Sequence, residues 1–279
     1  MSEFTTTARG DEVAYDLRGD GPALVFVAGA GPFRATDPWT TETAERAAAA
    51  GITTLVWDRL GRGESPAGGR LDLARELDAI AATIEVAGGA AVLCGHSSGC
   101  ALSLAAADAG LPVIGLALWE APLAGAADET QAWSDEIERL IDTGDLEGAT
   151  EHYMKDMPPE WLAGAKAAPE WPQIAASIVS QRADGQSLAW AQRALETTTL
   201  ASIDVPVLAM FGRETFPEMR AAAAALARVL PHAEAKELPG AMHAWEPEPM
   251  AAELVAFTTR CAASSSTRNG SSGSMPTVI

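Results

Sequence analysis

One serine of this chain lies in a sequence pattern that could make it a nucleophile. The pentapeptide Gly95-His96-Ser97-Ser98-Gly99 has the form G-x-S-x-G and follows an apolar run over 90–94 that predicts a buried strand. The residues after it predict a helix. A sharp strand-to-helix turn strains its central residue, and glycines two residues to either side let the neighbouring elements pack closely. The pattern therefore predicts that Ser97 presents a reactive hydroxyl at such a turn.

A serine hydroxyl is a weak nucleophile at neutral pH. It needs a base within hydrogen-bond reach and a third group that orients the base. The chain offers four histidines as bases. The side chain of His96 should point into the fold, whereas His152 and His232 are expected at the surface. His243 lies between a short predicted strand and a predicted helix.

Two glutamates are candidates for the orienting group, because each follows a predicted strand. Glu120 comes directly after the strand over 113–119, and Glu214 follows the strand over 206–211. The carboxyl ends of parallel strands meet at one edge of a sheet, so either carboxylate could reach a histidine there. Each also has a structural interpretation, Glu120 as a charge at a hinge and Glu214 as a solvated charge where a helix begins.

Strands and helices alternate along the chain outside its central part. Residues 4–9 and 12–18 predict an opening hairpin. Further strands are predicted over 23–27, 53–57, 91–94, 113–119, 206–211 and 234–238, with helices over 39–50, 71–86, 97–109, 218–230 and 247–260. This alternation predicts an α/β fold with a mostly parallel sheet and helices on both of its faces.

The strand pattern stops in the middle of the chain. Short helical segments broken by prolines predict a helical cap of residues 121–204, inserted into a core of residues 1–120 and 205–261. The remaining residues, 262–279, form a polar low-complexity tail, which cannot support a packed core.

The predicted cap is rich in aromatic side chains. For each of them, packing of the cap against the core is one interpretation. Together they predict an apolar pocket for an acyl or aromatic group. The predicted substrate-binding residues are Trp133, Trp161, Trp171, Trp190 and Tyr153.

Four motifs occur in the order that is usual in the α/β-hydrolase superfamily, which the chain resembles over roughly residues 4–260. They are a small-residue loop over 28–32, a D-x-x-G-x-G-x-S turn over 58–65, the G-x-S-x-G turn and a histidine near the C-terminus. The resemblance implies an α/β-hydrolase fold with an eight-stranded sheet and an inserted helical cap. It also implies that Ser97 is the nucleophile and that His243, in the loop after the last strand, is the base.

The acid departs from the family's commonest pattern. Most relatives carry an aspartate three residues after the glycine that follows the strand over 206–211, and counted from Gly212 that position is Thr215. Haloalkane dehalogenases of one subgroup take the acid from the tip of the preceding strand, where this chain has Glu120. The resemblance therefore favours Glu120 as the acid, with Glu214 as the alternative. The resemblance to the dehalogenases ends there. Their nucleophile is an aspartate, whereas this chain has Ser97, and a serine forms acyl esters.

Acyl transfer also needs hydrogen-bond donors aimed at the developing oxyanion. In the family one donor is the backbone N–H after the nucleophile, here that of Ser98 at the start of a helix whose dipole adds to it. The second donor comes from the loop over 28–32, where we expect the N–H of Ala30. The family's usual histidine-glycine pair is Ala28-Gly29 here, but the backbone supplies the hydrogen bond.

Composition argues against several classes of partner. The formal charge of −19, from 38 acidic against 19 basic side chains, disfavours nucleic acid and anionic membranes. No apolar stretch is long enough to span a membrane and the N-terminus lacks a signal-peptide pattern, so we expect a cytoplasmic protein. The three cysteines lack metal-ligand spacing and fit reduced, buried thiols. We predict no metal and no cofactor, and the sequence indicates no oligomeric state.

The leading hypothesis is a metal-independent serine hydrolase that cleaves a carboxylic ester or lactone of a hydrophobic small molecule through an acyl-enzyme. A carbon–carbon bond hydrolase of diketone-like compounds would use the same three residues with a cap. A non-catalytic small-ligand receptor on the same fold is a third interpretation, against which the intact Ser97 and His243 argue. Substrate choice depends on pocket shape, which these motifs do not determine.

Overall fold

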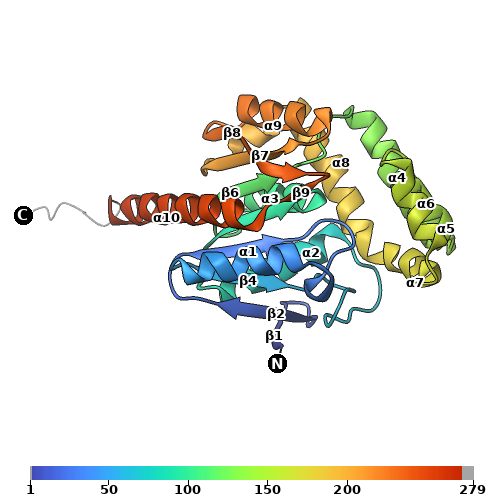
Figure 1. The fold of residues 1–279 in the computed structure, drawn as a ribbon, viewed down its shortest axis with the longest axis horizontal. Coiled ribbons are helices and arrows are strands. Elements are labelled where there is room, and N and C mark those ends of the chain that lie inside the picture. Colours follow the sequence, from blue (N-terminus) through green and yellow to red (C-terminus); the bar gives the residue numbers. More distant parts are fainter. Residues whose placement is uncertain (1, 272–279) are drawn as a thin grey trace, which may run out of the picture.

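A nine-stranded sheet forms the centre of the computed structural model, which describes residues 2–271 (Figure 1). The strands are β1 (Glu3–Thr6), β2 (Glu12–Arg18), β3 (Ala23–Val27), β4 (Thr53–Trp57), β5 (Ala91–His96), β6 (Val113–Trp119), β7 (Val207–Glu214), β8 (Ala233–Ala241) and β9 (Ala244–Trp245). Their order in the sheet is β1-β2-β4-β3-β5-β6-β7-β8-β9. The strands from β3 to β8 are parallel, whereas β1, β2 and β9 pair antiparallel with their neighbours.

Helices cover both faces of the sheet because its central strands are apolar on both sides. Helices α1 (Pro38–Ala49) and α10 (Pro247–Ser271) cover one face, and α2 (Leu73–Val86), α3 (Ser98–Asp108) and α9 (Pro217–Val229) cover the other. Helix α8 (Arg182–Glu196) packs on α2 and α3. Successive residues of a strand point to opposite faces. In β3, Val25 belongs to the core cluster of α2 and α3, and Phe26 to the cluster of α1 and α10.

Local signals set where several helices begin and end. The Asp72 carboxylate accepts a hydrogen bond from the Arg75 N–H and so caps the start of α2. Pro217 begins α9, where its fixed φ suits the first helical position and its missing N–H costs nothing. The first helix after β6, α4 (Ala127–Thr143), ends at Gly144, whose φ of 80° is left-handed.

A helical insertion lies between β6 and β7. It contains α4, α5 (Leu146–Tyr153), α6 (Pro159–Ala167), α7 (Trp171–Ala176) and α8, with short 3-10 helices η2 (Ser177–Gln181) and η3 (Thr199–Ser202). Figure 1 shows α4–α7 grouped at one end of the molecule, with α10 projecting from the opposite end. Residues of α4, α5 and η2 form a small apolar core, and Ala30 packs against it. Helix α8 differs, because Leu188 and Leu195 join the main core.

The predicted α/β class, the mostly parallel sheet and the helical insertion are confirmed. The expectation of eight strands is wrong, because Ala244 and Trp245 fold back on the end of β8 as a ninth strand in the described part of the chain. Helix α10 continues through residues 262–271, which we predicted as part of a low-complexity tail, while residues 272–279 lie outside the described residues. The division into core and cap stays a prediction. Within residues 2–271, no helix combines the length and apolarity needed to cross a membrane.

Candidate active site

Ser97 lies at the turn between β5 and α3. Its φ of 56° and ψ of −126° form a conformation that non-glycine residues rarely adopt. The Ser97 N–H donates to the Trp119 carbonyl oxygen of β6 at 2.9 Å. A Cβ on Gly95 would lie 2.6 Å from the Gly99 carbonyl oxygen, and one on Gly99 would lie 2.1 Å from the Val27 carbonyl oxygen. Both glycines of the motif are therefore required sterically, as the sequence predicted.

His243 lies in the two-residue turn between β8 and β9. Met242 and His243 have positive φ values of 51° and 72°, as the central residues of a type I′ hairpin turn do. The carbonyl oxygen of His243 accepts hydrogen bonds from His96 Nε2 at 3.0 Å and from Trp119 Nε1 at 3.2 Å. These two side chains hold the backbone that carries the imidazole.

Glu120 follows the last residue of β6 and is only 1% exposed. One carboxylate oxygen, Oε2, accepts a hydrogen bond from His243 Nδ1 at 2.6 Å, and the other accepts the Gly212 N–H at 2.8 Å. Glu214, the alternative acid, is exposed at the end of β7, and only its backbone carbonyl reaches this turn, through the Met242 N–H. The structure therefore brings Glu120, and not Glu214, to the His243 ring.

Strained backbone is concentrated at this site. The described residues include five non-glycine residues with positive φ, and four of them are Ser97, Glu120, Met242 and His243. The fifth, Thr198, lies just before η3. A residue held in such a region costs of order 1–3 kcal/mol and persists only where the surrounding structure fixes it. Three of the four strained residues at the site are the predicted nucleophile, base and acid.

The Glu120 carboxylate is kept ionised despite its burial. Burial alone would raise the pKa of Glu120, but the hydrogen bond from His243, the nearby Thr215 hydroxyl and the Gly212 N–H outweigh it and hold the pKa below its ordinary value. Thr215 Oγ1 is buried and forms no hydrogen bond within residues 2–271, so it acts on the carboxylate as a nearby dipole. Thr215, at the position expected for an aspartate, thus lies beside Glu120.

His96 is part of the site, although the sequence indicated only that it points into the fold. Its ring lies between those of His243 and Trp245, with centroid distances of 4.9 Å and 5.0 Å. Burial and the nearby His243 lower the pKa of His96 to about 4. The ring is therefore neutral at pH 7 and donates its Nε2 proton to the His243 carbonyl.

The two remaining histidines lie away from Ser97 in different environments. His232 is exposed, as predicted, and its Nε2 bonds to Asp204 Oδ1 at 2.8 Å. His152 is half-buried and its Nε2 is enclosed without a partner in the described residues, so the prediction of a surface position is wrong for it. Helix α4 packs on α5 beside this residue, and Trp133 of α4 donates a hydrogen bond to the His152 carbonyl oxygen at 3.1 Å.

The loop after β3 packs directly against the serine. A Cβ on Gly29 would lie 2.9 Å from Ser97 Cβ and 3.6 Å from Ser97 Oγ. Ser98 is the first residue of α3, where backbone N–H groups have no partner within the helix. In the described residues, the Ser98 N–H and the Ala30 N–H both lack a protein acceptor.

The predicted substrate-binding aromatics separate into two groups. Trp133 and Tyr153 contact each other in the small core of the insertion, with ring centroids 5.1 Å apart. Trp161 meets Phe216, in the loop after β7, at 6.2 Å between ring centroids. These three lie beside loops that carry site residues.

The other two aromatics make packing contacts elsewhere. Trp171 lies under the Lys166 ammonium group, 5.9 Å from its ring centroid, and Trp190 packs against the main core. Neither Trp171 nor Trp190 makes a ring contact with Ser97, Glu120 or His243 in the described residues.

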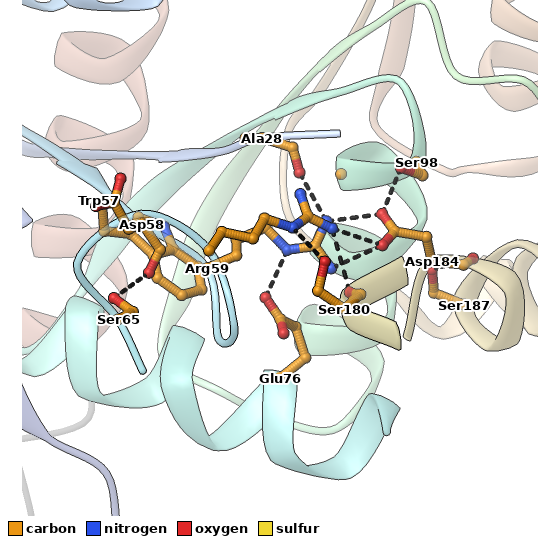
Figure 2. A network of polar contacts seen from close by, with 12 residues as sticks. Ala28, Trp57, Asp58, Arg59, Ser65, Glu76, Ser98, Ser180, Asp184 and Ser187 are labelled. Carbon is orange, nitrogen blue, oxygen red and sulfur yellow. Dashed lines mark hydrogen bonds and ion pairs between the residues drawn. The ribbon is translucent and has the colours of Figure 1, made fainter. Parts of the chain in front are cut away.

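Sequence reasoning missed a buried ion cluster formed by Arg59, Arg62, Glu76 and Asp184 (Figure 2). Two of its members belong to the D-x-x-G-x-G-x-S turn, to which the sequence assigned no role beyond the motif. Asp184 precedes Leu188 by four residues and so falls on the apolar face of α8. An acidic residue on a buried helix face needs a partner, and that signal could have revealed the cluster.

Comparison with known proteins agrees with this geometry. Residues 24–257 match the model of the alpha/beta hydrolase family, which is most of the chain. The chain therefore belongs to the alpha/beta hydrolase family.

Solved structures extend this assignment. An alpha/beta hydrolase from Sphaerobacter thermophilus is 31% identical, with a TM-score of 0.75 over 91% of this chain and 99% of that one. An esterase from Thermogutta terrifontis is 21% identical, with a TM-score of 0.60 over 96% of this chain and 98% of that one. A haloalkane dehalogenase loop variant from Bradyrhizobium elkanii is 21% identical, with a TM-score of 0.63 over 96% and 99% of the two chains. The last two show a common fold alone. No curated protein matches the chain.

Proposed function

We propose that this protein is a serine hydrolase that cleaves a carboxylic ester or lactone of a hydrophobic small molecule. Ser97 is the nucleophile, His243 the base and Glu120 the acid that orients the base. The observation that carries the proposal is the 2.6 Å hydrogen bond between His243 Nδ1 and Glu120 Oε2, in a site where Ser97 occupies a strained strand-to-helix turn.

In the first half of the reaction, Ser97 Oγ attacks the carbonyl carbon of the substrate and His243 Nε2 takes the hydroxyl proton. Nδ1 is already bonded to Glu120, so Nε2 is the nitrogen left to act. The ionised carboxylate stabilises the imidazolium that forms. Ser97 Oγ forms no hydrogen bond within residues 2–271, and catalytic hydrogen bonds of this kind commonly tighten only when substrate is bound.

The tetrahedral intermediate then collapses. The bond to the leaving alkoxide breaks, His243 gives its proton to that oxygen, and an ester on Ser97 remains. Water attacks this acyl-enzyme and gives a proton to His243; the bond between the acyl carbon and Ser97 Oγ then breaks, His243 returns the proton to Oγ, and the carboxylic acid product is released. The N–H groups of Ser98 and Ala30 are the proposed oxyanion donors, each contributing about 2.7–4 kcal/mol to transition-state stabilisation.

The apolar surroundings of the loop support a hydrophobic substrate. Ala30 packs against the small core of the insertion, whose members include Ile137 and Tyr153. A charged acyl group placed there would lose its hydration without gaining a partner. The formal charge of −19 also repels anionic substrates. We therefore expect neutral apolar acyl or aryl esters to be preferred over monoesters of dicarboxylic acids.

A substrate panel tests the proposal. The purified protein and its Ser97→Ala variant are assayed on p-nitrophenyl esters of increasing chain length, a lactone, a dicarboxylate monoester and a vinylogous diketone. We expect turnover of the neutral esters or the lactone, and a loss of about 10⁶-fold in kcat in Ser97→Ala with an unchanged circular dichroism spectrum. Cleavage of the diketone alone, or ester turnover that survives in Ser97→Ala, would contradict the proposal.

A further inference from the structure

The buried ion cluster joins the loop after β3 to helix α8 of the insertion. Its four side chains are each 3% exposed or less, and they carry two positive and two negative charges. Figure 2 shows Arg59 extending between Glu76 of α2 and Asp184 of α8, close to the Ala28 carbonyl and to Ser98. Replacing buried ion pairs by apolar residues is often neutral or stabilising, so such a cluster is weak evidence for a role in stability. Its contacts with the site indicate a different role.

Both arginines bind the backbone of the loop beside the nucleophile. The Gly29 carbonyl oxygen accepts hydrogen bonds from Arg62 Nη1 at 2.5 Å and from Arg59 Nη1 at 3.2 Å. Arg59 Nη1 also reaches the Ala28 carbonyl oxygen at 3.1 Å. The described residues contain no cis peptide bond, and the C=O and N–H of a trans peptide point in opposite directions. Holding the Gly29 carbonyl therefore also fixes the direction of the Ala30 N–H.

One carboxylate of the insertion connects these arginines to the second proposed donor. Asp184 Oδ1 accepts from Arg59 Nη1 at 2.7 Å and from the Ser98 hydroxyl at 2.6 Å, and Oδ2 accepts from Arg62 Nη2 at 2.9 Å. Asp184 thus contacts Ser98, whose N–H is one proposed oxyanion donor. It also contacts Arg59 and Arg62, which hold the peptide that carries the other donor.

The charges persist at neutral pH. Burial would raise the pKa of Asp184, but Arg59 and Arg62 outweigh it and keep the pKa below its ordinary value. Burial and repulsion by Arg59 lower the pKa of Arg62 to about 10, which still leaves the guanidinium protonated at pH 7. Hydrogen bonds from charged donors to a carbonyl are stronger than neutral ones, so the Gly29 peptide is firmly held.

We propose that Arg62, with Arg59, is a positioning residue for the oxyanion site: it holds the Gly29–Ala30 peptide so that the Ala30 N–H faces the oxyanion formed on attack by Ser97. Asp184 of α8 keeps both guanidinium groups in place and so couples the insertion to the chemical step. This inference rests on the proposed function, because it assigns a task within that reaction.

The test compares Arg62→Met and Arg62→Lys with Arg182→Met. Arg182 is a matched control because it is also a buried arginine, in the helix that carries Asp184, but its ion pairs are with Glu138 and Asp142 of α4. Each variant is assayed on an ester that the wild type hydrolyses. Binding is measured for a trifluoromethyl ketone, which forms a hemiketal oxyanion on the serine, and for an ether analogue that has no carbonyl.

We expect Arg62→Met to lower kcat by about 10- to 100-fold with KM within about threefold, since loss of one oxyanion donor costs about 10²–10³ in kcat. The Ki of the trifluoromethyl ketone should rise by the same factor as kcat/KM falls, while the ether analogue binds as before. Arg62→Lys keeps the charge, so its kcat and its Ki for the ketone should lie between those of the wild type and those of Arg62→Met. Arg182→Met should lose stability without losing kcat.

The inference is overturned if both Arg62 variants keep kcat and ketone affinity within twofold of Arg182→Met. If Arg62→Met does not fold, Arg62→Lys decides by the same criteria. A wild-type protein that hydrolyses no ester would contradict the proposed function itself, and the inference with it. An active wild type with unaffected Arg62 variants would contradict the inference alone.

Discussion

The body of the molecule and the outer part of its insertion, helices α6 and α7, are built differently. On the body side, Ser97, Glu120 and His243 are held in left-handed conformations by buried hydrogen bonds. On the insertion side, α6 has no buried residue and α7 has only Ala175. The body thus fixes its reacting groups against strain, whereas the outer insertion presents half-buried side chains on lightly packed helices.

This difference predicts separate effects of substitution in the two regions. Preorganised groups act on the transition state, so changes in the body should lower kcat or destabilise the fold. Lightly packed helices have low local stability, so changes there should mainly alter substrate binding. Helix α8 belongs with the body in this comparison, because Asp184 is fully buried in the ion cluster.

The largest expected effect concerns the two glutamates at the ends of β6 and β7. Glu120→Gln removes the charge that stabilises the His243 imidazolium and disturbs its tautomer, so kcat should fall by about 10⁴-fold with KM little changed. Glu214→Gln changes an exposed charge, which acts weakly through water, so kcat should stay within about tenfold. Steady-state kinetics of both variants on one ester make the comparison. A severe loss of kcat in Glu214→Gln, with a normal kcat in Glu120→Gln, would show that the acid is Glu214 of β7 and not Glu120.

Two glycines test the contrast in packing. Gly99→Ala would place its Cβ 2.1 Å from the Val27 carbonyl oxygen, so we expect the free energy of unfolding to fall by at least about 3 kcal/mol. Gly164, inside α6, has no atom within 4 Å of the position of its Cβ, and Gly164→Ala should raise the free energy of unfolding by about 0.5–1 kcal/mol. Urea unfolding measures both. A harmless Gly99→Ala would show that the turn is not tightly packed.

The pH dependence of stability tests the buried His96. Its pKa is about 4 in the folded protein, against 6.5 ordinarily. Between these values the unfolded chain binds a proton that the folded chain does not, so the stabilisation from neutral His96 is complete above pH 6.5 and is lost as the pH falls towards 4. From pH 7 to 4 the wild type should lose about 3 kcal/mol more unfolding free energy than His96→Gln.

The measurement compares urea unfolding of the wild type and of His96→Gln at pH 7 and at pH 4. Parallel curves for the wild type and His96→Gln would show that His96 is not held neutral.

The smallest expected effect lies in the outer insertion. Trp161 contacts Phe216 beside the site, whereas Trp171 contacts Lys166. Trp161→Ala should therefore raise KM several-fold for an aryl ester while kcat stays within about twofold, and Trp171→Ala should leave both near the wild-type values. Equal KM values in the two variants would remove Trp161 from the proposed binding surface.

Most of the body could be predicted from the sequence because its signals are local. The strands over 23–27 and 113–119 are continuous runs without a polar side chain, and the strand over 53–57 is two β-branched threonines followed by three apolar residues; the structure has all three with the same bounds. The ninth strand has only two residues and depends on pairing with the end of β8, which no local pattern reveals. The end of α10 was also missed, because residues 262–271 are mostly serine, threonine, asparagine and glycine, which favour a helix less than alanine does.

The site was predictable where a motif or strand end carried it. Ser97 stands in a pentapeptide and Glu120 directly after a strand, but the contacts of His96 and Asp184 join residues that are far apart in the chain. The tryptophans of the insertion were predicted as one group because composition does not say which way a side chain faces. For that reason Trp190 was grouped with the others, although it packs against the main core.

Mass spectrometry tests most directly whether Ser97 is the nucleophile of an acyl-transfer site. The intact and digested protein is analysed after reaction with a fluorophosphonate, which phosphonylates activated serines. We expect one adduct, on the peptide that contains Ser97, no adduct in Ser97→Ala, and a much slower reaction in Glu120→Gln than in Glu214→Gln. An adduct on another residue, or an unmodified wild-type protein, would contradict the assignment of Ser97 as the nucleophile.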